Sequence, residues 1–90
     1  MGKTVFVAFY LDGTSNSTGI TFTLPDTNSD IPVYAPISEI KDNGTWATIP
    51  GKIALLASSA TVTVFRDIAG TAFTNSGAKA CIGQFWYEAA

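Results

Sequence analysis

The chain has 90 residues and a formal net charge of −2; 13% of its residues are charged and 47% are hydrophobic. Its five cations are scattered singly, which argues against nucleic acid and anionic membranes as partners, because both require clustered positive charge. No apolar run reaches the length of about 20 residues that a membrane span needs, and a single cysteine rules out an internal disulfide.

A chain of this length predicts one domain over residues 1–90. Small domains have a high ratio of surface to volume, so these many apolar side chains cannot all lie inside one copy. We therefore expect some of them to face another subunit. Cys81 lies between Ala80 and Ile82 and is expected to be a buried small hydrophobe.

The first expected strand is Thr4–Leu11, which is apolar at both parities. A strand with one wet face would alternate apolar and polar residues, so we expect cover on both sides, one of them being the domain core. Asp12–Gly19 reads as a polar turn. Ile20–Leu24 then alternates cleanly, with threonines on the outward side, and Pro25 ends it.

Ile31–Ile40 holds two prolines four residues apart, which favours an edge strand or an extended segment. The segment Lys41–Gly44 ends in Asn-Gly, a strong signal for a tight hairpin. Thr45–Ile49 is the expected return strand, with Trp46 as its apolar anchor. Pro50-Gly51 breaks the chain again.

The C-terminal half predicts three further strands. Lys52–Ser59 is too short for a confident helix, so a buried strand is favoured over a short helix. Thr61–Arg66 alternates, and Ala80–Glu88 is the last strand. Together these segments predict an all-β fold of about seven short strands, arranged as an antiparallel β-sandwich or jelly roll.

Catalytic chemistry has little to build on in this chain. There is no histidine, so the commonest general base and metal ligand is missing. Nearly all carboxylates lie in apparent turns, where they usually bond their own backbone. Asp26–Asp30 offers oxygens at alternate positions but lacks the glycine and distal glutamate of a calcium loop. We expect no catalytic residue, cofactor or metal site.

Aromatic residues supply the candidate interface. In Phe85-Trp86-Tyr87 neighbouring side chains must point to opposite faces of a strand, so at least one ring leaves the core unless both faces are covered. Trp and Tyr are enriched at protein interfaces. The candidate interface residues are Phe6, Tyr10, Phe85, Trp86 and Tyr87. The alternative is an ordinary sandwich strand with one wet face.

Several stretches carry a family resemblance: Val5-Phe6-Val7, Gly13–Asn16, Thr21–Pro25, Asp42-Asn43-Gly44 and Gly83–Glu88. Across nearly the whole chain they resemble the β-sandwich domains at the C-terminal ends of bacteriophage tail fibres and related appendage proteins. The resemblance implies a virion protein made in the host cytoplasm. It also implies a homotrimer that contacts other tail or capsid proteins and a host surface glycan or receptor.

One departure from the family bears on this expectation. Family members usually carry an earlier strand and a stalk before the position of Gly2-Lys3, whereas this chain begins at Met1. It is either a complete small protein or a piece of a longer one. A complete protein would also fit a capsid decoration (cement) role, in which a trimer clamps neighbouring capsomers. A carbohydrate-acting enzyme is a remote third alternative, since no acid/base pair is visible.

Overall fold

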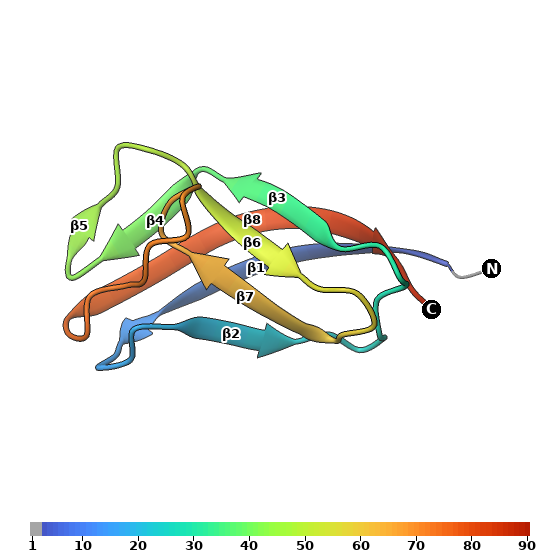
Figure 1. Ribbon diagram of the computed structural model, residues 1–90. Coiled ribbons are helices and arrows are strands. Elements are labelled where there is room, and N and C mark those ends of the chain that lie inside the picture. The colour runs from blue at the N-terminus through green and yellow to red at the C-terminus, as the bar shows by residue number, and fades with distance from the viewer. Residues whose placement is uncertain (1–2) are drawn as a thin grey trace.

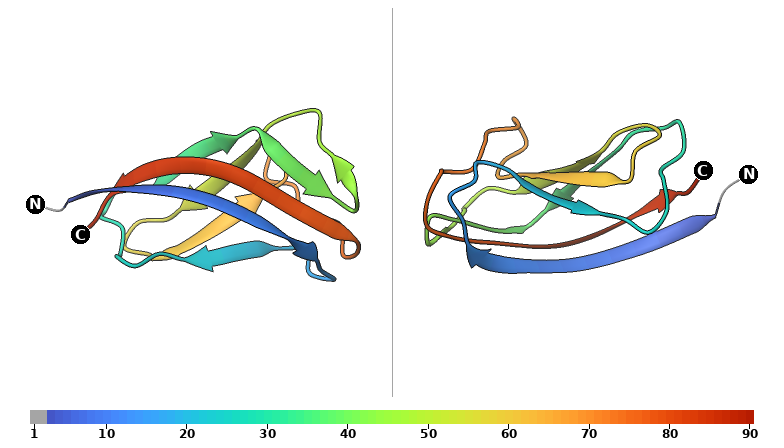
Figure 2. Two further views of the ribbon diagram at one scale, coloured as in Figure 1. Left: turned by 180° about the vertical axis from the view of Figure 1, so that it is seen from behind. Right: turned by 90° about the horizontal axis from the view of Figure 1, so that it is seen from below.

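The computed structural model describes residues 3–90, and within them the chain is all-β, with two four-stranded antiparallel sheets facing each other (Figures 1 and 2). The expected antiparallel sandwich is confirmed, with eight strands where the sequence predicts about seven. The strands are β1 (Thr4–Thr14), β2 (Ile20–Thr23), β3 (Val33–Ile37), β4 (Glu39–Asp42), β5 (Thr45–Trp46), β6 (Gly51–Leu55), β7 (Thr61–Phe65) and β8 (Ala78–Glu88).

Sheet A has the order β1-β8-β4-β5 and is dominated by two long strands, β1 and β8. These pair along their whole length without a bulge, from Thr4 opposite Glu88 to Thr14 opposite Ala78. The long curved ribbon they form runs across one side of the molecule (Figure 2). β1 therefore continues three residues beyond the predicted end at Leu11, since Asp12, Gly13 and Thr14 still find partners on β8.

Sheet B has the order β2-β7-β6-β3. The chain passes from sheet B to sheet A at Ser38, between the end of β3 and the start of β4. Pro36 lies in β3, which is an edge strand as expected, because an edge tolerates a residue without a backbone donor. The ambiguous segment after Gly51 forms β6, so the preference for a strand over a helix is confirmed.

The inward side chains of β6, β7 and β8 form the best-covered part of the core. Ile53, Leu55, Val62, Cys81 and Tyr87 have no measurable exposure. Cys81 is thus the buried small hydrophobe that the sequence predicts. Each of these three strands is paired on both sides within its sheet, so its inward side chains are fully covered.

The β4–β5 turn is the hairpin that the Asn-Gly pair predicts. Asn43 and Gly44 have φ angles of 50° and 80°, the positive values that a two-residue hairpin turn requires. The return strand is shorter than expected, however, because only Thr45 and Trp46 pair with β4. Trp46 is also not a buried anchor: it is exposed and its ring lies under the Lys41 ammonium group. β5 is the edge strand of sheet A, beyond β4.

One long side of the sandwich is less well covered than the rest. β1 and β2 form the edges of the two sheets on this side. The inward residues Val5, Val7, Phe9 and Leu11 of β1 are only half-buried, and so is Phe22 of β2. The Phe9 and Phe22 rings meet across the gap with centroids 4.9 Å apart. The core is therefore open along the β1–β2 side.

Candidate interaction surface

The outer face of sheet A carries a group of exposed apolar side chains, which we call the aromatic face: Phe6, Tyr10, Ile82 and Trp86. The first two lie on β1, the other two on β8, and all point away from the core because they occupy the even positions of their strands. The register places Phe6 opposite Trp86 and Tyr10 opposite Ile82. Cross-strand neighbours of this kind lie about 5 Å apart, so the four side chains form two close pairs on the same face of sheet A.

The three rings of the aromatic face are well exposed. Phe6 and Tyr10 are each 65% exposed and Trp86 is 60% exposed. Single exposed apolar residues are normal on protein surfaces, whereas a contiguous group marks a site of interaction. Ala8 and Gln84 face each other across the two strands and lie between the Phe6–Trp86 and Tyr10–Ile82 pairs, so no large apolar side chain occupies the centre of the aromatic face.

The remaining two residues of the predicted interface do not reach the surface. Phe85 is 5% exposed and Tyr87 is fully buried, where its hydroxyl donates a 2.9 Å hydrogen bond to the Asp26 carbonyl oxygen. Both belong to the core and are withdrawn from the candidate interface. The underlying expectation, that Phe85 and Tyr87 share one face while Trp86 takes the other, is confirmed.

Two grooves flank the aromatic face. One, of about 730 Å³, lies where the β3–β4 corner meets β1 and β8, and its lining includes Tyr10, Glu39 and Ile82. The other, of about 500 Å³, lies between β3 and the end of β8, and its lining includes Tyr34 and Trp86. Sequence reasoning missed these grooves, and it missed Ile82 and Tyr34 as surface residues. Only alternation with Trp86 could have indicated the outward direction of Ile82.

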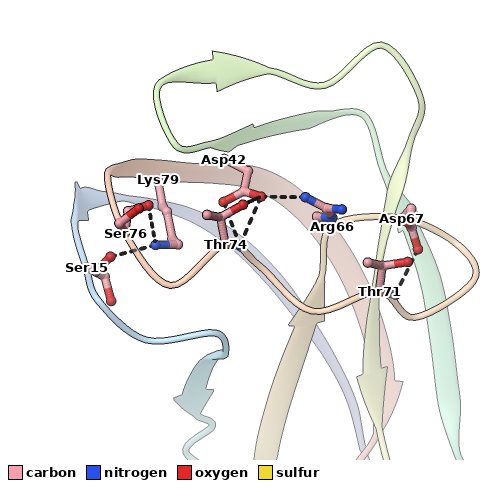
Figure 3. Close-up of polar contacts among 8 residues, drawn as sticks. All are labelled: Ser15, Asp42, Arg66, Asp67, Thr71, Thr74, Ser76 and Lys79. Carbon is pink, nitrogen blue, oxygen red and sulfur yellow. Dashed lines mark hydrogen bonds and ion pairs between the residues drawn. The ribbon is translucent and has the colours of Figure 1, made fainter.

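A polar cluster at the other end of the molecule is centred on Asp42 (Figure 3). The Arg66 guanidinium group donates to the Asp42 carboxylate at 2.8 Å, and Thr74 donates from its backbone N–H at 3.1 Å and from its hydroxyl at 2.9 Å. Burial raises the pKa of this carboxyl, but the bonds from Arg66 and Thr74 outweigh burial and leave the pKa below its ordinary value. The cluster joins β4 of sheet A to the segment after β7 of sheet B.

Two further polar groups hold loops in place near this cluster (Figure 3). The Asp67 carboxylate accepts a 2.9 Å bond from the Thr71 backbone N–H, which lowers the Asp67 pKa. Lys79 is 3% exposed, and its ammonium group donates to the carbonyl oxygens of Ser15 and Ser76 at 2.6 and 3.1 Å. Both groups are occupied in closing turns.

The loop considered for calcium uses its side chains in separate structural contacts. Asp26 forms an exposed ion pair with Lys3 at 3.1 Å, and Asp30 accepts a bond from the Ser58 hydroxyl. Asn28 is almost fully buried, and its side-chain amide donates a hydrogen bond to the Ile31 carbonyl oxygen at 2.8 Å. Within residues 3–90, no group of three or more acidic or cysteine side chains gathers in a way that could hold a metal ion.

Burial raises the pKa of the Cys81 thiol to about 11, so this side chain is almost entirely protonated near neutral pH.

No helix long and apolar enough to cross a membrane occurs in residues 3–90. Comparisons of the chain with protein-family models, with curated proteins and with solved structures found no match. The site therefore has to be interpreted from its own geometry.

Proposed function

We propose that this chain is a non-enzymatic structural protein of a bacteriophage particle, most simply a tail-fibre or appendage domain that attaches to a host surface. The observation that carries the proposal is the aromatic face, where Phe6, Tyr10 and Trp86 stand exposed on two long rigid strands. Rigid aromatic side chains on a sheet provide large contact area at a low cost in conformational entropy.

The contacts of Asp42 and Asp67 favour this proposal over a carbohydrate-acting enzyme that would use either of them. A glycosidase needs one carboxylic acid with a raised pKa and a second carboxylate facing it. Asp42 and Asp67 have lowered pKa values instead, and each is occupied by hydrogen bonds to its own chain. Product release from an oligosaccharide mixture, absent in buffer controls, would restore the enzyme as the better interpretation.

A capsid decoration role is the second candidate, because an exposed apolar sheet face also suits contact with a shell. Electron microscopy of phage particles labelled with an antibody against this chain separates the two roles. Label at the tail tips supports attachment, and label over the head supports decoration. Particles that carry the encoding gene but take no label would refute both.

The aromatic face can be tested with a pair of matched substitutions. Trp86 and Tyr34 are 60% and 59% exposed, but only Trp86 belongs to the aromatic face. We expect Trp86→Ala to weaken particle incorporation or host-cell binding by at least tenfold, the usual effect of losing a central aromatic contact. We expect Tyr34→Ala to change it far less. Equal losses would place the contact in the groove that the two residues share rather than on the aromatic face.

The homotrimer expected from the family resemblance stays part of this proposal, with host glycans or receptors and other virion proteins as partners. Light scattering on the purified chain tests it directly, since a trimer has three times the 9.5 kDa mass of the chain. A particle that stays at one or two times the 9.5 kDa chain mass at every concentration would contradict it.

A further inference from the structure

β1 is an edge strand without the features that normally protect an edge. β8 pairs with one side of it, and no strand within residues 3–90 pairs with the other. Natural edge strands are kept short, interrupted by proline or a bulge, or guarded by lysine. β1 spans eleven residues with no proline, no lysine and no bulge, and Asp12 is its single charge. The edge strands β2 and β5 have four and two residues, and β3 contains Pro36.

Two hydrogen bonds just beyond the ends of β1 show which backbone groups of β1 point to the open edge. The Lys3 carbonyl oxygen accepts from the Ala89 N–H at 2.8 Å, and the Ser15 N–H donates to the Gly77 carbonyl oxygen at 3.1 Å. Both contacts continue the β1–β8 register, so the odd residues of this strand bond to β8. In an antiparallel ladder the even residues then direct their N–H and C=O groups the other way.

The open edge also borders the least covered part of the core. A hollow of about 330 Å³ lies between β1 and β2, with Val5, Val7, Phe9 and Phe22 among its lining residues. These are the side chains that stay half-buried in the single chain. A strand added to β1 would lie beside this hollow and remove part of its apolar lining from water, which favours association.

We propose that β1 pairs antiparallel with β1 of a second copy of this chain, around a twofold axis at Ala8. This register places the open-edge groups of the two strands opposite each other, because Ala8 is an even residue. Phe6 of each copy then faces Tyr10 of the other, and Thr4 faces Asp12. Aromatic pairs directly opposite each other are among the favourable cross-strand pairs, and no two like charges meet.

The strand is suited to its own copy for a further reason. The small side chain of Ala8 lies on the axis, between the two Phe6–Tyr10 pairs, and brings no charge or polar group to the centre of the seam. Five residue pairs, each exchanging two hydrogen bonds, give about ten backbone bonds, a number typical of specific interfaces. The product is one continuous eight-stranded sheet that carries two copies of the aromatic face side by side. This pairing depends on the edge of β1 and is independent of the proposed phage role; trimers joined through β1 would form hexamers, so the two associations can exist together.

Matched lysine substitutions test the seam. Ala8 and Gln84 are cross-strand partners on the same outer face, but only Ala8 lies at the open edge. In Ala8→Lys two ammonium groups meet at the twofold axis, so we expect the dissociation constant to rise at least tenfold. In Gln84→Lys the same charge lies one strand away and the dimer should persist. Light scattering up to about 200 µM provides the measurement.

Each outcome of this experiment is informative. Wild-type protein of twice the chain mass, dissociated by Ala8→Lys alone, supports the pairing. Equal dissociation by Gln84→Lys means that the copies meet through the aromatic face and overturns it. Wild-type protein that stays monomeric, or forms a trimer with no even-numbered species, also overturns it. Neither of these last results bears on where the chain lies in a virion, which microscopy decides.

Cysteine cross-linking tests the register without adding charge. Hydrogen-bonded antiparallel partners have Cα atoms about 5.5 Å apart, within the range of a disulfide. Ala8→Cys should therefore give a covalent dimer under mild oxidation. Gln84→Cys should not, since three strand spacings of about 4.8 Å separate its two copies. Cys81 is fully buried and does not compete. An Ala8→Cys protein that folds but fails to cross-link would overturn the Ala8-centred register.

Discussion

Replacing Asp42 with asparagine tests whether its negative charge holds the two sheets together at the polar end. The substitution keeps the side-chain size but removes the charge that Arg66 and Thr74 address at 2.8 to 3.1 Å. Hydrogen bonds to a charged group each contribute about 1.5–3 kcal/mol. Asparagine keeps an oxygen that can accept from Thr74, so only part of those bonds is lost. The Arg66 side chain is 39% exposed and its share is reduced by solvent, so we expect Asp42→Asn to cost about 2 kcal/mol in total.

The pH dependence of this difference identifies the charge as its cause. The pKa of Asp42 in the folded chain lies below its ordinary value of 3.8. A depressed carboxyl pKa contributes stability that is fully present above the unfolded-state pKa and is lost as pH falls through the folded-state pKa. The gap in free energy of unfolding between wild type and Asp42→Asn should therefore be constant near neutral pH and shrink as the pH is lowered below 3.8.

Urea denaturation followed by tryptophan fluorescence measures the effect, at one fixed protein concentration because association would add to stability. With a slope of about 1 kcal/mol per M for a chain of this size, the midpoint should fall by about 2 M at pH 7. Asp67→Asn serves as the control, since Asp67 lies in an exposed loop, and its midpoint should move much less. A gap for Asp42→Asn that stays unchanged into strong acid would refute the electrostatic explanation.

Three further outcomes follow from the packing. A Cβ at Gly51 would lie 2.5 Å from a carbonyl oxygen of β7, so Gly51→Ala should cost about 1–3 kcal/mol of stability and lower the melting temperature by several degrees. A Cβ at Gly19 would have nothing within 4 Å, so Gly19→Ala should leave the melting temperature unchanged. The Cys81 thiol, with its pKa of about 11, should react with a thiol reagent at pH 8 only after denaturation; rapid native reaction would show that the core opens there. Tyr87→Phe should cost about 1 kcal/mol in calorimetry by removing the bond to the Asp26 carbonyl, and a neutral result would mean that water replaces it.

The positions of strands and turns could be predicted because they depend on local signals. Alternation across Ile20–Leu24 and Thr61–Arg66 gave strands where β2 and β7 lie, and Asn43-Gly44 gave the hairpin turn. The length of the return strand after Gly44 was wrong because pairing depends on a partner, and β4 offers one to Thr45 and Trp46 alone. The aromatic face was predicted in part: three of its residues were named, but Phe85 and Tyr87 were included with them.

The residue order is enough to specify an antiparallel all-β chain whose apolar side chains exceed what one small core can hold. Period-two alternation states which side chains share a face, and it separates Trp86 from Phe85 and Tyr87 without reference to any neighbour. It does not state which face turns inward when both are apolar, as in β1. The tertiary structure makes that choice. β1 pairs with β8, some seventy residues away in the chain, and the sheet they form turns Val7 and Phe9 toward sheet B. The open edge of β1 and the grooves beside the aromatic face likewise exist only once strands distant in sequence lie together, because an edge is defined by the strand that is missing beside it.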